Sequence, residues 1–504
     1  MKKRIPFLIV VLVAILWSSC RKDFDVTQLP TGHLEFEKDT IYLDTIFTGI
    51  SSSTYRFKVY NRSDEAIRIP TIHLAAGANS FYRINVDGRT GNTITNTMIN
   101  AQDSLFVFVE STIDFAQVVN PLYEDKLLFD NDTDSQEVVL VSLVQDAHFL
   151  YPSRDAQTGE IGTVSIGVDG NGDDVLIEGF ELPNDYTFTA DKPWVIYGYC
   201  VVPDNKTLTI DSGAQVHFHN NSGLIVNQGA SLQSNGTLAN PVLIQGDRLE
   251  PEYENIAAQW GIIWLRDGSV SNTINYTTIK NGTVGLLVES AVVPSSTQLT
   301  LTNTQLYNCA NYGLLAQTAN VKGTNMIINN CGQSAFAGVF GGNYNFMHCT
   351  FANYWQGGLR TDPAIYLGNF LETTTGNITN DLQAASFTNC IIDGNNALEF
   401  VLDNDNTALF NYSFTNTMIK FDDYQHLYDS DPLYDFTNGT LFVNCLLNED
   451  ADFRDAYEND LIIGADSAGN GLGNASGASQ VPADILGVNR TTSPDIGAYQ
   501  HIIF

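Results

Sequence analysis

Acidic, basic and aromatic residues gather between positions 247 and 264. The members that could contact a ligand are Asp247, Arg248, Glu250, Tyr253, Trp260 and Trp264. Paired carboxylates can cleave a glycosidic bond, and aromatic rings provide stacking platforms for sugar rings. The simpler interpretation is a protruding loop whose tryptophans pack against the protein. Glycan binding without cleavage is the next hypothesis, and hydrolysis is the third.

A second group surrounds the Gly357-Gly358 turn and consists of Tyr354, Trp355, Arg360 and Asp362. Aromatic rings next to charged groups are typical of a groove that contacts a ligand. A capping or loop role is the alternative, and it needs no ligand. We therefore treat Tyr354, Trp355 and Arg360 as candidate ligand-binding residues.

Two segments carry residue types that bind metals. Oxygen ligands alternate at Asp169, Asn171 and Asp173, with Glu178 beyond them, and calcium takes six to eight oxygens. The sixth position of an EF-hand-like loop should be glycine and is Asp174 here, so a tight turn is the alternative. His217 and His219 would lie on one side of a strand and could share a metal, but no third ligand is evident nearby. Calcium is thus the one candidate cofactor.

Signatures of catalysis are scarce elsewhere in the chain. From residue 196 to the end there are nine basic residues and no two are adjacent, whereas a uronate lyase needs a Lys or Arg as base and charge neutraliser. No G-x-S-x-G motif is present. Whether the protein is an enzyme stays open, with the balance against catalysis.

The overall charge narrows the range of partners. The chain has 24 Lys and Arg against 57 Asp and Glu, a formal net charge of −33. Such a surface repels nucleic acid, which is therefore not an expected partner, and it disfavours polyanionic substrates unless calcium intervenes. Only 16% of residues are charged and 43% are hydrophobic, which is typical of a folded, β-rich chain and not of disorder.

The N-terminus has the features of a secretory leader. Lys2, Lys3 and Arg4 precede an apolar run over 6–17, and two serines then lead to Cys20. We expect residues 1–19 to be a lipoprotein signal peptide, Cys20 to carry acyl chains such as palmitate, and 20–30 to form a tether. An ordinary signal peptide with an incidental Cys20 is the alternative. The expected location is the outer membrane, lipid-anchored and on the cell surface.

Residues 31–148 alternate apolar and polar side chains over short segments with turns between them. Examples are 54–60, 104–109 and 137–143. This period of two, interrupted by turn signals every 8–12 residues, predicts an immunoglobulin-like β-sandwich. Residues 149–191 are predicted to be a linker or a first cap.

From 192 to 445 the sequence is repetitive. Leu306-Tyr307-Asn308-Cys309 returns 22 residues later as Ile328-Asn329-Asn330-Cys331, and Phe346-Met347-His348-Cys349 follows after 18 more. Phe387-Thr388-Asn389 matches Phe414-Thr415-Asn416 at an offset of 27. Such spacing without helical periodicity predicts a β-solenoid, in which stacked Asn side chains bond along the axis and each neighbouring Cys points inward. Stacked free thiols are favoured over disulfides for Cys200, Cys309, Cys331, Cys349, Cys390 and Cys445.

These motifs resemble those of a known group of proteins. The segments Gly213-Ala214-Gln215-Val216, Gly229-Ala230-Ser231-Leu232 and Gln259-Trp260-Gly261-Ile262, with the ending Pro494-Asp495-Ile496-Gly497-Ala498-Tyr499-Gln500, resemble the parallel β-helix repeat lipoproteins of Bacteroidetes that end in a PDIGAYE-like segment. Gln500 replaces the usual Glu. The resemblance covers about 195–504 and implies a right-handed parallel β-helix over 192–445 and a closing segment over 446–504. With the immunoglobulin-like β-sandwich before it, the chain is expected to be all-β.

The resemblance says little about function. We expect a surface lipoprotein with a non-catalytic binding or adhesion role, towards glycan or an envelope protein. A polysaccharide-degrading enzyme, either hydrolase or lyase, and an architectural envelope component are the alternatives. Carboxylates converging in a groove would favour the enzyme, whereas a groove lined by aromatic rings without paired acids would favour binding.

Overall fold

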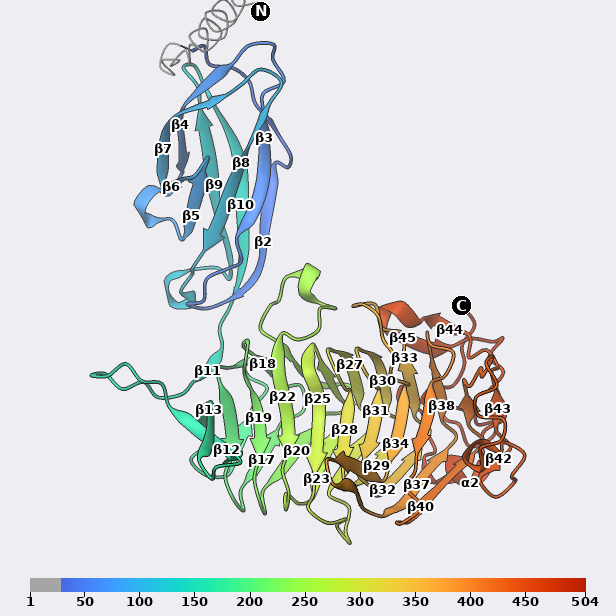
Figure 1. The fold of residues 1–504 in the computed structure, drawn as a ribbon. Helices are drawn as coiled ribbons and strands as arrows, with labels where there is room; N and C mark the ends of the chain where they lie inside the picture. The colour runs from blue at the N-terminus through green and yellow to red at the C-terminus, as the bar shows by residue number, and fades with distance from the viewer. Residues whose placement is uncertain (1–28) are drawn as a thin grey trace, which may run out of the picture. The chain divides into compact units, whose positions relative to one another are not determined.

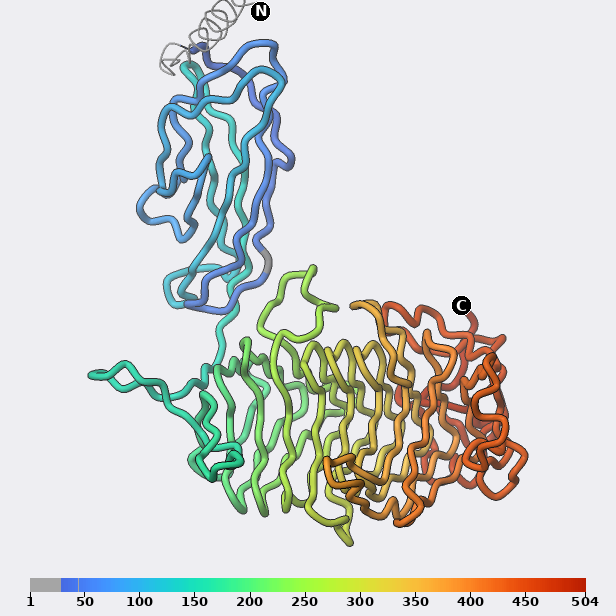
Figure 2. The backbone as a smooth tube through the Cα atoms, in the orientation of Figure 1, coloured from blue at the N-terminus to red at the C-terminus, as the bar shows by residue number. Residues whose placement is uncertain are grey.

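The computed structural model describes residues 29–504, which divide into one compact unit ending at Asp146 and a second over Ala147–Phe504 (Figures 1 and 2). The leader and Cys20 lie outside the described residues. Within 29–504, no helix is long and apolar enough to cross a membrane.

The first unit is a sandwich of two five-stranded sheets, as the sequence predicts. One sheet has the order β1 (Glu35–Phe36), β3 (Tyr55–Tyr60), β8 (Ser104–Ser111), β5 (Tyr82–Val86) and β6 (Arg89–Gly91). The other has the order β2 (Thr40–Phe47), β10 (Ser135–Gln145), β9 (Leu122–Asp130), β4 (Ile67–Leu74) and β7 (Thr93–Ile99). Alternation sets the fold: Leu105, Val107 and Val109 of β8 are buried between the sheets, while the residues between them face outward.

The second unit is a parallel β-helix, in which three long sheets run side by side along the axis (Figure 1). Sheet one contains β11 (His148–Leu150), β15 (Trp194–Ile196), β18 (Gln215–Phe218), β21 (Val242–Gly246), β24 (Thr277–Lys280), β27 (Gln305–Cys309), β30 (Ile327–Cys331), β33 (Thr350–Asn353), β38 (Ile391–Gly394), β41 (Met418–Ile419) and β43 (Leu446–Leu447). Sheet two contains β12 (Thr163–Val168), β13 (Asp174–Glu181), β16 (Tyr199–Val202), β19 (Gly223–Val226), β22 (Trp260–Leu265), β25 (Gly282–Glu289), β28 (Leu314–Gln317), β31 (Phe336–Val339), β34 (Ile365–Gly368) and β39 (Phe400–Asp403). Sheet three contains β14 (Tyr186–Phe188), β17 (Thr207–Ile210), β20 (Ser231–Asn235), β23 (Asn272–Asn275), β26 (Leu299–Thr302), β29 (Asn320–Thr324), β32 (Gly342–Met347), β37 (Leu382–Thr388), β40 (Phe410–Thr415) and β42 (Phe442–Val443).

The β-helix begins earlier than the sequence predicts. Strand β11 already pairs in parallel with β15, β13 with β16 and β14 with β17, so much of 149–191 belongs to the first coil. Only β12, which is antiparallel to β13, covers the open edge of sheet two as a cap would. The last strand of sheet one, β43, covers Leu446–Leu447.

Asparagines in the left-handed conformation mark successive turns, and their amides bond along the axis as predicted. Asn303 and Asn325 both have φ near +50°, and Asn325 Nδ2 donates to Asn303 Oδ1 at 2.9 Å. On another corner, Asn330 Nδ2 donates to Asn308 Oδ1 at 2.7 Å. Asn tolerates this conformation better than most residues, which explains why it recurs at the turns.

The six cysteines among residues 29–504 are free thiols, as favoured from the sequence, but they fall on different corners. Cys309 and Cys331 lie next to each other in strand register, each at the end of a strand of sheet one. Cys349 and Cys390 each come directly before a strand of that sheet. The offset of 22 is therefore one turn of the β-helix and the offset of 18 is not. The offset of 27 is also one turn, since Phe387 pairs with Phe414.

The closing segment lies along the side of the β-helix. Ile496 and Ala498 are fully buried and pack with Ile391 and Met418 of sheet one, outside the main core. Arg490 is also fully buried and donates to the carbonyls of Gly497 and Ala498. The segment carries the small strands β44 (Phe453–Asp455) and β45 (Asp460–Ile463) and helix α2 (Ala475–Gln480). It covers sheet one laterally.

Candidate ligand-binding groove

The corner between sheets one and two carries the long loops of the β-helix. Residues 247–259 connect β21 to β22, and residues 354–364 connect β33 to β34. In the coil before the first of these loops, residues 219–222 make the same connection. Insertions at one corner of stacked coils project on one side, which is where such folds build sites.

Two hollows on the first coils form one groove at this corner. They have volumes of about 660 and 630 Å³ and share Glu178, Asn220 and Asn221. We call them together the corner groove; its other lining side chains include Tyr151, Arg154, Ile161, Tyr197, His219, Tyr199, Ile262 and Thr283. Each volume is within the range of about 300–1,000 Å³ that small-ligand sites have.

Three successive coils place Tyr197, His219 and Asp247 in a row. The rings of Tyr197 and His219 stack with centroids 4.3 Å apart and planes 29° apart. His219 Nδ1 donates to Asp247 Oδ2 at 2.7 Å, and Asp247 is largely covered, with 9% of its side chain exposed. The hydrogen bond to Asp247 raises the pKa of His219, while burial and the nearby Asp247 charge raise the pKa of Tyr197 to about 12. Tyr197 therefore stays protonated and is held in one orientation by its stacked neighbour.

Tyr199 lies flat against the outside of sheet two because its neighbours on the next coils are glycines. A Cβ atom on Gly223 would be 2.7 Å from Tyr199 Cε1, and a Cβ on Gly261 would collide with the Tyr199 hydroxyl. No other residue type leaves room for the ring at these two positions. Burial raises the pKa of Tyr199, so this hydroxyl also stays neutral.

Few charges line the corner groove. Glu178 is the one carboxylate among its lining residues, and Asp247, at the end of the row, is already engaged by His219. Arg154, Asn220 and Asn221 are exposed and supply hydrogen-bond donors and acceptors. The site therefore combines aromatic rings with uncharged and singly charged polar groups.

Most of the predicted ligand-binding residues between 247 and 264 have other roles. Arg248 pairs with Glu250 at 3.1 Å and lies 3.7 Å over the Tyr253 ring, so these three hold the loop together. Trp260 is 1% exposed and stacks on Phe218 in the core. Trp264 lies on sheet two with the Arg266 guanidinium 5.3 Å from its ring. Two of the predicted residues contribute to the corner groove: Trp260 lines one of its hollows, and Asp247 acts through His219. Arg248, Glu250 and Tyr253 stabilise the loop.

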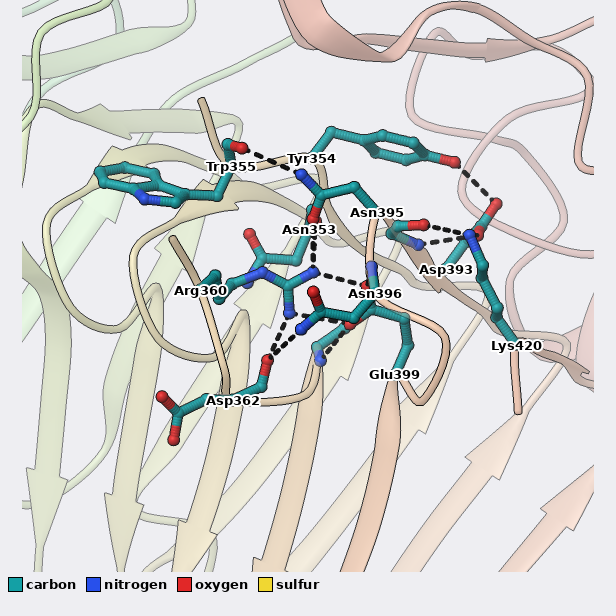
Figure 3. A network of polar contacts seen from close by, with 12 residues as sticks. Asn353, Tyr354, Trp355, Arg360, Asp362, Asp393, Asn395, Asn396, Glu399 and Lys420 are labelled. Carbon is teal, nitrogen blue, oxygen red and sulfur yellow. Dashed lines mark hydrogen bonds and ion pairs between the residues drawn. The ribbon is translucent and has the colours of Figure 1, made fainter. Parts of the chain in front are cut away.

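Arg360 was predicted as a ligand-binding residue, and the structure contradicts this because it is buried. Its side chain is 1% exposed and pairs with Glu399, whose side chain is 0% exposed (Figure 3). Arg360 Nη2 also donates to Asn353 O and Asn395 Oδ1, both at 2.8 Å, and Nη1 donates to Asp362 O. The guanidinium ties the long loop to the next coil and is inaccessible to a ligand.

Tyr354 and Trp355 belong to the same structural network (Figure 3). Tyr354 donates from its hydroxyl to Asp393 Oδ2 at 2.9 Å, and Asp393 lies 3.7 Å from Lys420 Nζ. Burial raises the pKa of both Tyr354 and Asp393. Trp355 O accepts from Asn395 Nδ2 at 3.0 Å. The capping role therefore explains this cluster.

The candidate calcium ligands form a tight turn instead of a cation site. Asp169 Oδ1 accepts from the N–H groups of Asn171 and Asp173, which lowers the pKa of Asp169. Glu178 lies apart, in the middle of β13 opposite Thr163. Among residues 29–504 no three His, Cys, Asp or Glu side chains gather as metal ligands would.

His217 does not join His219 in a metal site. Its side chain is buried, its Nδ1 lies 3.1 Å from Gly246 O, and burial lowers its pKa to about 4. His219 contributes to the corner groove instead.

Sequence reasoning missed the tyrosines of the corner groove. Tyr197 and Tyr199 flank Gly198, whose φ of +70° turns the chain from sheet one to sheet two. The Tyr-Gly-Tyr pattern was the available signal, but it acquires meaning only when the coil containing His219 lies beside it.

Comparisons with known proteins leave the function open. No family model and no curated protein matches the chain. It is similar to a family 123 glycoside hydrolase from Clostridium perfringens (8% identical, 22% of this chain and 25% of that one, TM-score 0.16). It is also similar to the Dettilon tailspike protein (14% identical, 48% of this chain and 50% of that one, TM-score 0.20). A third similar structure is the catalytic unit of a GH87 α-1,3-glucanase from Streptomyces thermodiastaticus (10% identical, 72% of this chain and 83% of that one, TM-score 0.20). The chain thus spans a quarter of the length of the glycoside hydrolase and half of the length of the tailspike protein.

Proposed function

We propose that this protein binds a glycan in the corner groove without cleaving it. The observation that carries the proposal is the row Tyr197–His219 beside Tyr199, with Glu178 as the one lining carboxylate. Sugar rings present apolar faces that stack on aromatic side chains, and their hydroxyls bond to amide and carboxylate groups.

The same arrangement argues against glycoside hydrolysis. Hydrolysis usually requires two carboxyl groups about 5–10 Å apart across the bond, one of them free to donate a proton. Asp247 is engaged by His219, and the carboxylates Asp393 and Glu399 are buried in ion pairs and hydrogen bonds of the loop network. Glu178 is therefore left without a carboxylate partner among the residues that line the corner groove.

Replacing Tyr197 by alanine is expected to abolish most of the binding. Loss of a buried aromatic contact costs roughly 1.5–3 kcal/mol, so the dissociation constant should rise by about tenfold or more. A glycan array identifies ligands of the wild-type protein, and titration calorimetry then compares Tyr197→Ala with it.

Tyr424→Ala is the matched control for that experiment, because Tyr424 is 67% exposed and lies outside the corner groove. It should bind like the wild type. Unchanged affinity in Tyr197→Ala, or equal losses in the two variants, would refute the proposal.

We also propose that the mature protein is anchored to the outer membrane, facing the cell surface, through lipid on Cys20. The support is the leader itself, with its basic start, apolar run and Cys20. Cells grown with an alkyne-labelled palmitate should incorporate it into the wild-type protein and not into Cys20→Ser. A labelled Cys20→Ser protein, or an unlabelled wild type, would contradict the anchor.

A further inference from the structure

One outward face of the sandwich differs in charge from the rest of the chain. It is formed by the side chains of β3, β8, β5 and β6 that point away from the core, and we call it the sandwich face. Its strands carry four basic residues and one acidic residue: Arg56, Lys58, Arg83 and Arg89 against Glu110. Lys38, Arg62, Glu35 and Glu37 lie at its edge. A net positive face stands out on a protein with a formal charge of −33.

Strand register places the cations beside exposed aromatic rings. Arg56 lies opposite Phe108 and Lys58 opposite Phe106, on neighbouring antiparallel strands. Arg56 and Lys58 lie 5.7 and 5.0 Å from the Phe106 ring centroid, close enough for cation–π contact. These contacts hold both cations on the surface above the Phe106 ring.

The acidic groups of the sandwich face are already paired. Arg83 lies 3.6 Å from Glu110, which also accepts from Thr54, and Arg62 lies 3.3 Å from Glu35. Glu37 accepts from the backbone N–H of Lys58. Within residues 29–504, Arg56 and Lys58 form no ion pair, so their charge is available to an anion.

A hollow of about 520 Å³ lies beside Phe108, the residue opposite Arg56, and the ion pair of Arg83 and Glu110 also lines it. Its lining includes Phe108, Asn85, Thr90 and Asn92. Asn85 Oδ1 is buried and accepts no hydrogen bond from the described residues. A buried acceptor without a donor is unfavourable, so a ligand that donates a hydroxyl or N–H here would gain affinity.

We propose that the sandwich face binds a second glycan, one that carries a single acidic sugar. The sugar ring would stack on Phe108, a hydroxyl would donate to Asn85 Oδ1, and the carboxylate would lie between Arg56 and Lys58. A hollow of this volume fits a small ligand better than a flat protein surface. The net charge of the chain repels a polyanion, but screening within about 8–10 Å lets a single carboxylate reach the cations.

A matched panel of glycans tests this site. Terminal glucuronic and sialic acid oligosaccharides are compared with the same oligosaccharides ending in neutral sugars, by calorimetry on the full chain. We expect the acidic members to bind more tightly, and Arg56→Gln with Lys58→Gln to weaken their binding about tenfold or more. Asn85→Ala should also weaken it.

Controls separate this site from the corner groove. Lys126→Gln removes a basic residue that pairs with Glu137 on the other sheet and should leave binding unchanged. Tyr197→Ala should abolish binding in the corner groove and keep the acidic glycans bound. Equal binding of acidic and neutral members, or no effect of the double substitution, would overturn the inference. A dimer in light scattering that the double substitution dissociates would also overturn it, because a second copy would then be the ligand of this face.

Discussion

Glu399→Ala is expected to lower the free energy of unfolding by about 3–5 kcal/mol. The substitution removes the carboxylate that pairs with Arg360 while the guanidinium stays buried. A buried charge without its partner keeps the full cost of desolvation, which the ion pair had offset.

The geometry explains why the effect should be this large. Glu399 accepts from Arg360, from Ala364 N at 2.8 Å and from Asn396 N at 2.7 Å, so one carboxylate joins two successive corners (Figure 3). Burial nevertheless raises the pKa of Glu399, which shows that desolvation opposes its charge. The Arg360–Glu399 ion pair therefore fixes the position of the loop, and breaking it is expected to cost much of the free energy of unfolding.

Urea unfolding, followed by circular dichroism, measures this loss. Arg360→Met combined with Glu399→Leu removes both charges and should be closer to the wild type than Glu399→Ala alone. Asp362→Asn is a mild control, because Arg360 contacts the Asp362 carbonyl and not its carboxylate. A Glu399→Ala protein as stable as the wild type would contradict the structural role of this network.

Acid is expected to destabilise the β-helix through two buried histidines. The pKa of His217 is lowered to about 4 and that of His348 to about 3, in both cases mainly by burial. In the unfolded chain these two histidines have a pKa of about 6.5. Between about pH 6.5 and pH 4 the unfolded chain therefore binds more protons at these histidines than the folded chain does. The contribution of the two histidines to the free energy of unfolding is therefore fully present above about pH 6.5. It falls as the pH decreases, by up to about 1.4 kcal/mol per pH unit for each histidine.

The surroundings of His348 give the physical reason. Asn389 Nδ2 lies 2.8 Å from His348 Nε2, so Nε2 must accept and a proton there would oppose the amide N–H. The Arg490 charge lowers the pKa of His348 further. Since Asn389 also bonds to Asn474 and Gly497, protonation should first loosen the closing segment.

Hydrogen exchange at pH 7 and pH 5 tests this order of events. Peptides from 474–498 should lose protection at pH 5 before those of sheet three. His348→Gln should reduce the pH dependence of stability, and His219→Gln should not, because the pKa of His219 is raised and its contribution is lost as the pH rises. Burial raises the pKa of Asp393 and Glu399. Protonation of these carboxyl groups at lower pH therefore favours the folded chain and opposes the effect of the histidines. Equal slopes in wild type and His348→Gln would contradict the assignment.

The repeat pattern predicted the architecture because local periodicity determines which residues stack. The offset between Cys309 and Cys331 gave the length of one turn correctly. The similar segments that start at Gly213 and Gly229 lie at different corners, the first before sheet one and the second before sheet three. A single sequence does not distinguish three similar turns within one coil.

The candidate site was harder to predict because its parts come from different coils. Arg360 was a candidate ligand-binding residue beside two glycines, yet its buried partner Glu399 lies 39 residues further on. Arg248 and Tyr253 looked like a sugar platform and instead contact each other. Tyr197 and His219 were not linked in the sequence, because only the stacking of coils brings their rings together.

Binding without cleavage is tested most directly with a glycan that binds the wild-type protein. The glycan is incubated with an excess of the protein, and its mass is then measured. Mass spectrometry should recover it intact, while calorimetry of the same mixture reports binding that Tyr197→Ala lacks. Shortened or unsaturated products that appear with the wild type and not with Tyr197→Ala would show a catalytic groove and contradict binding without cleavage.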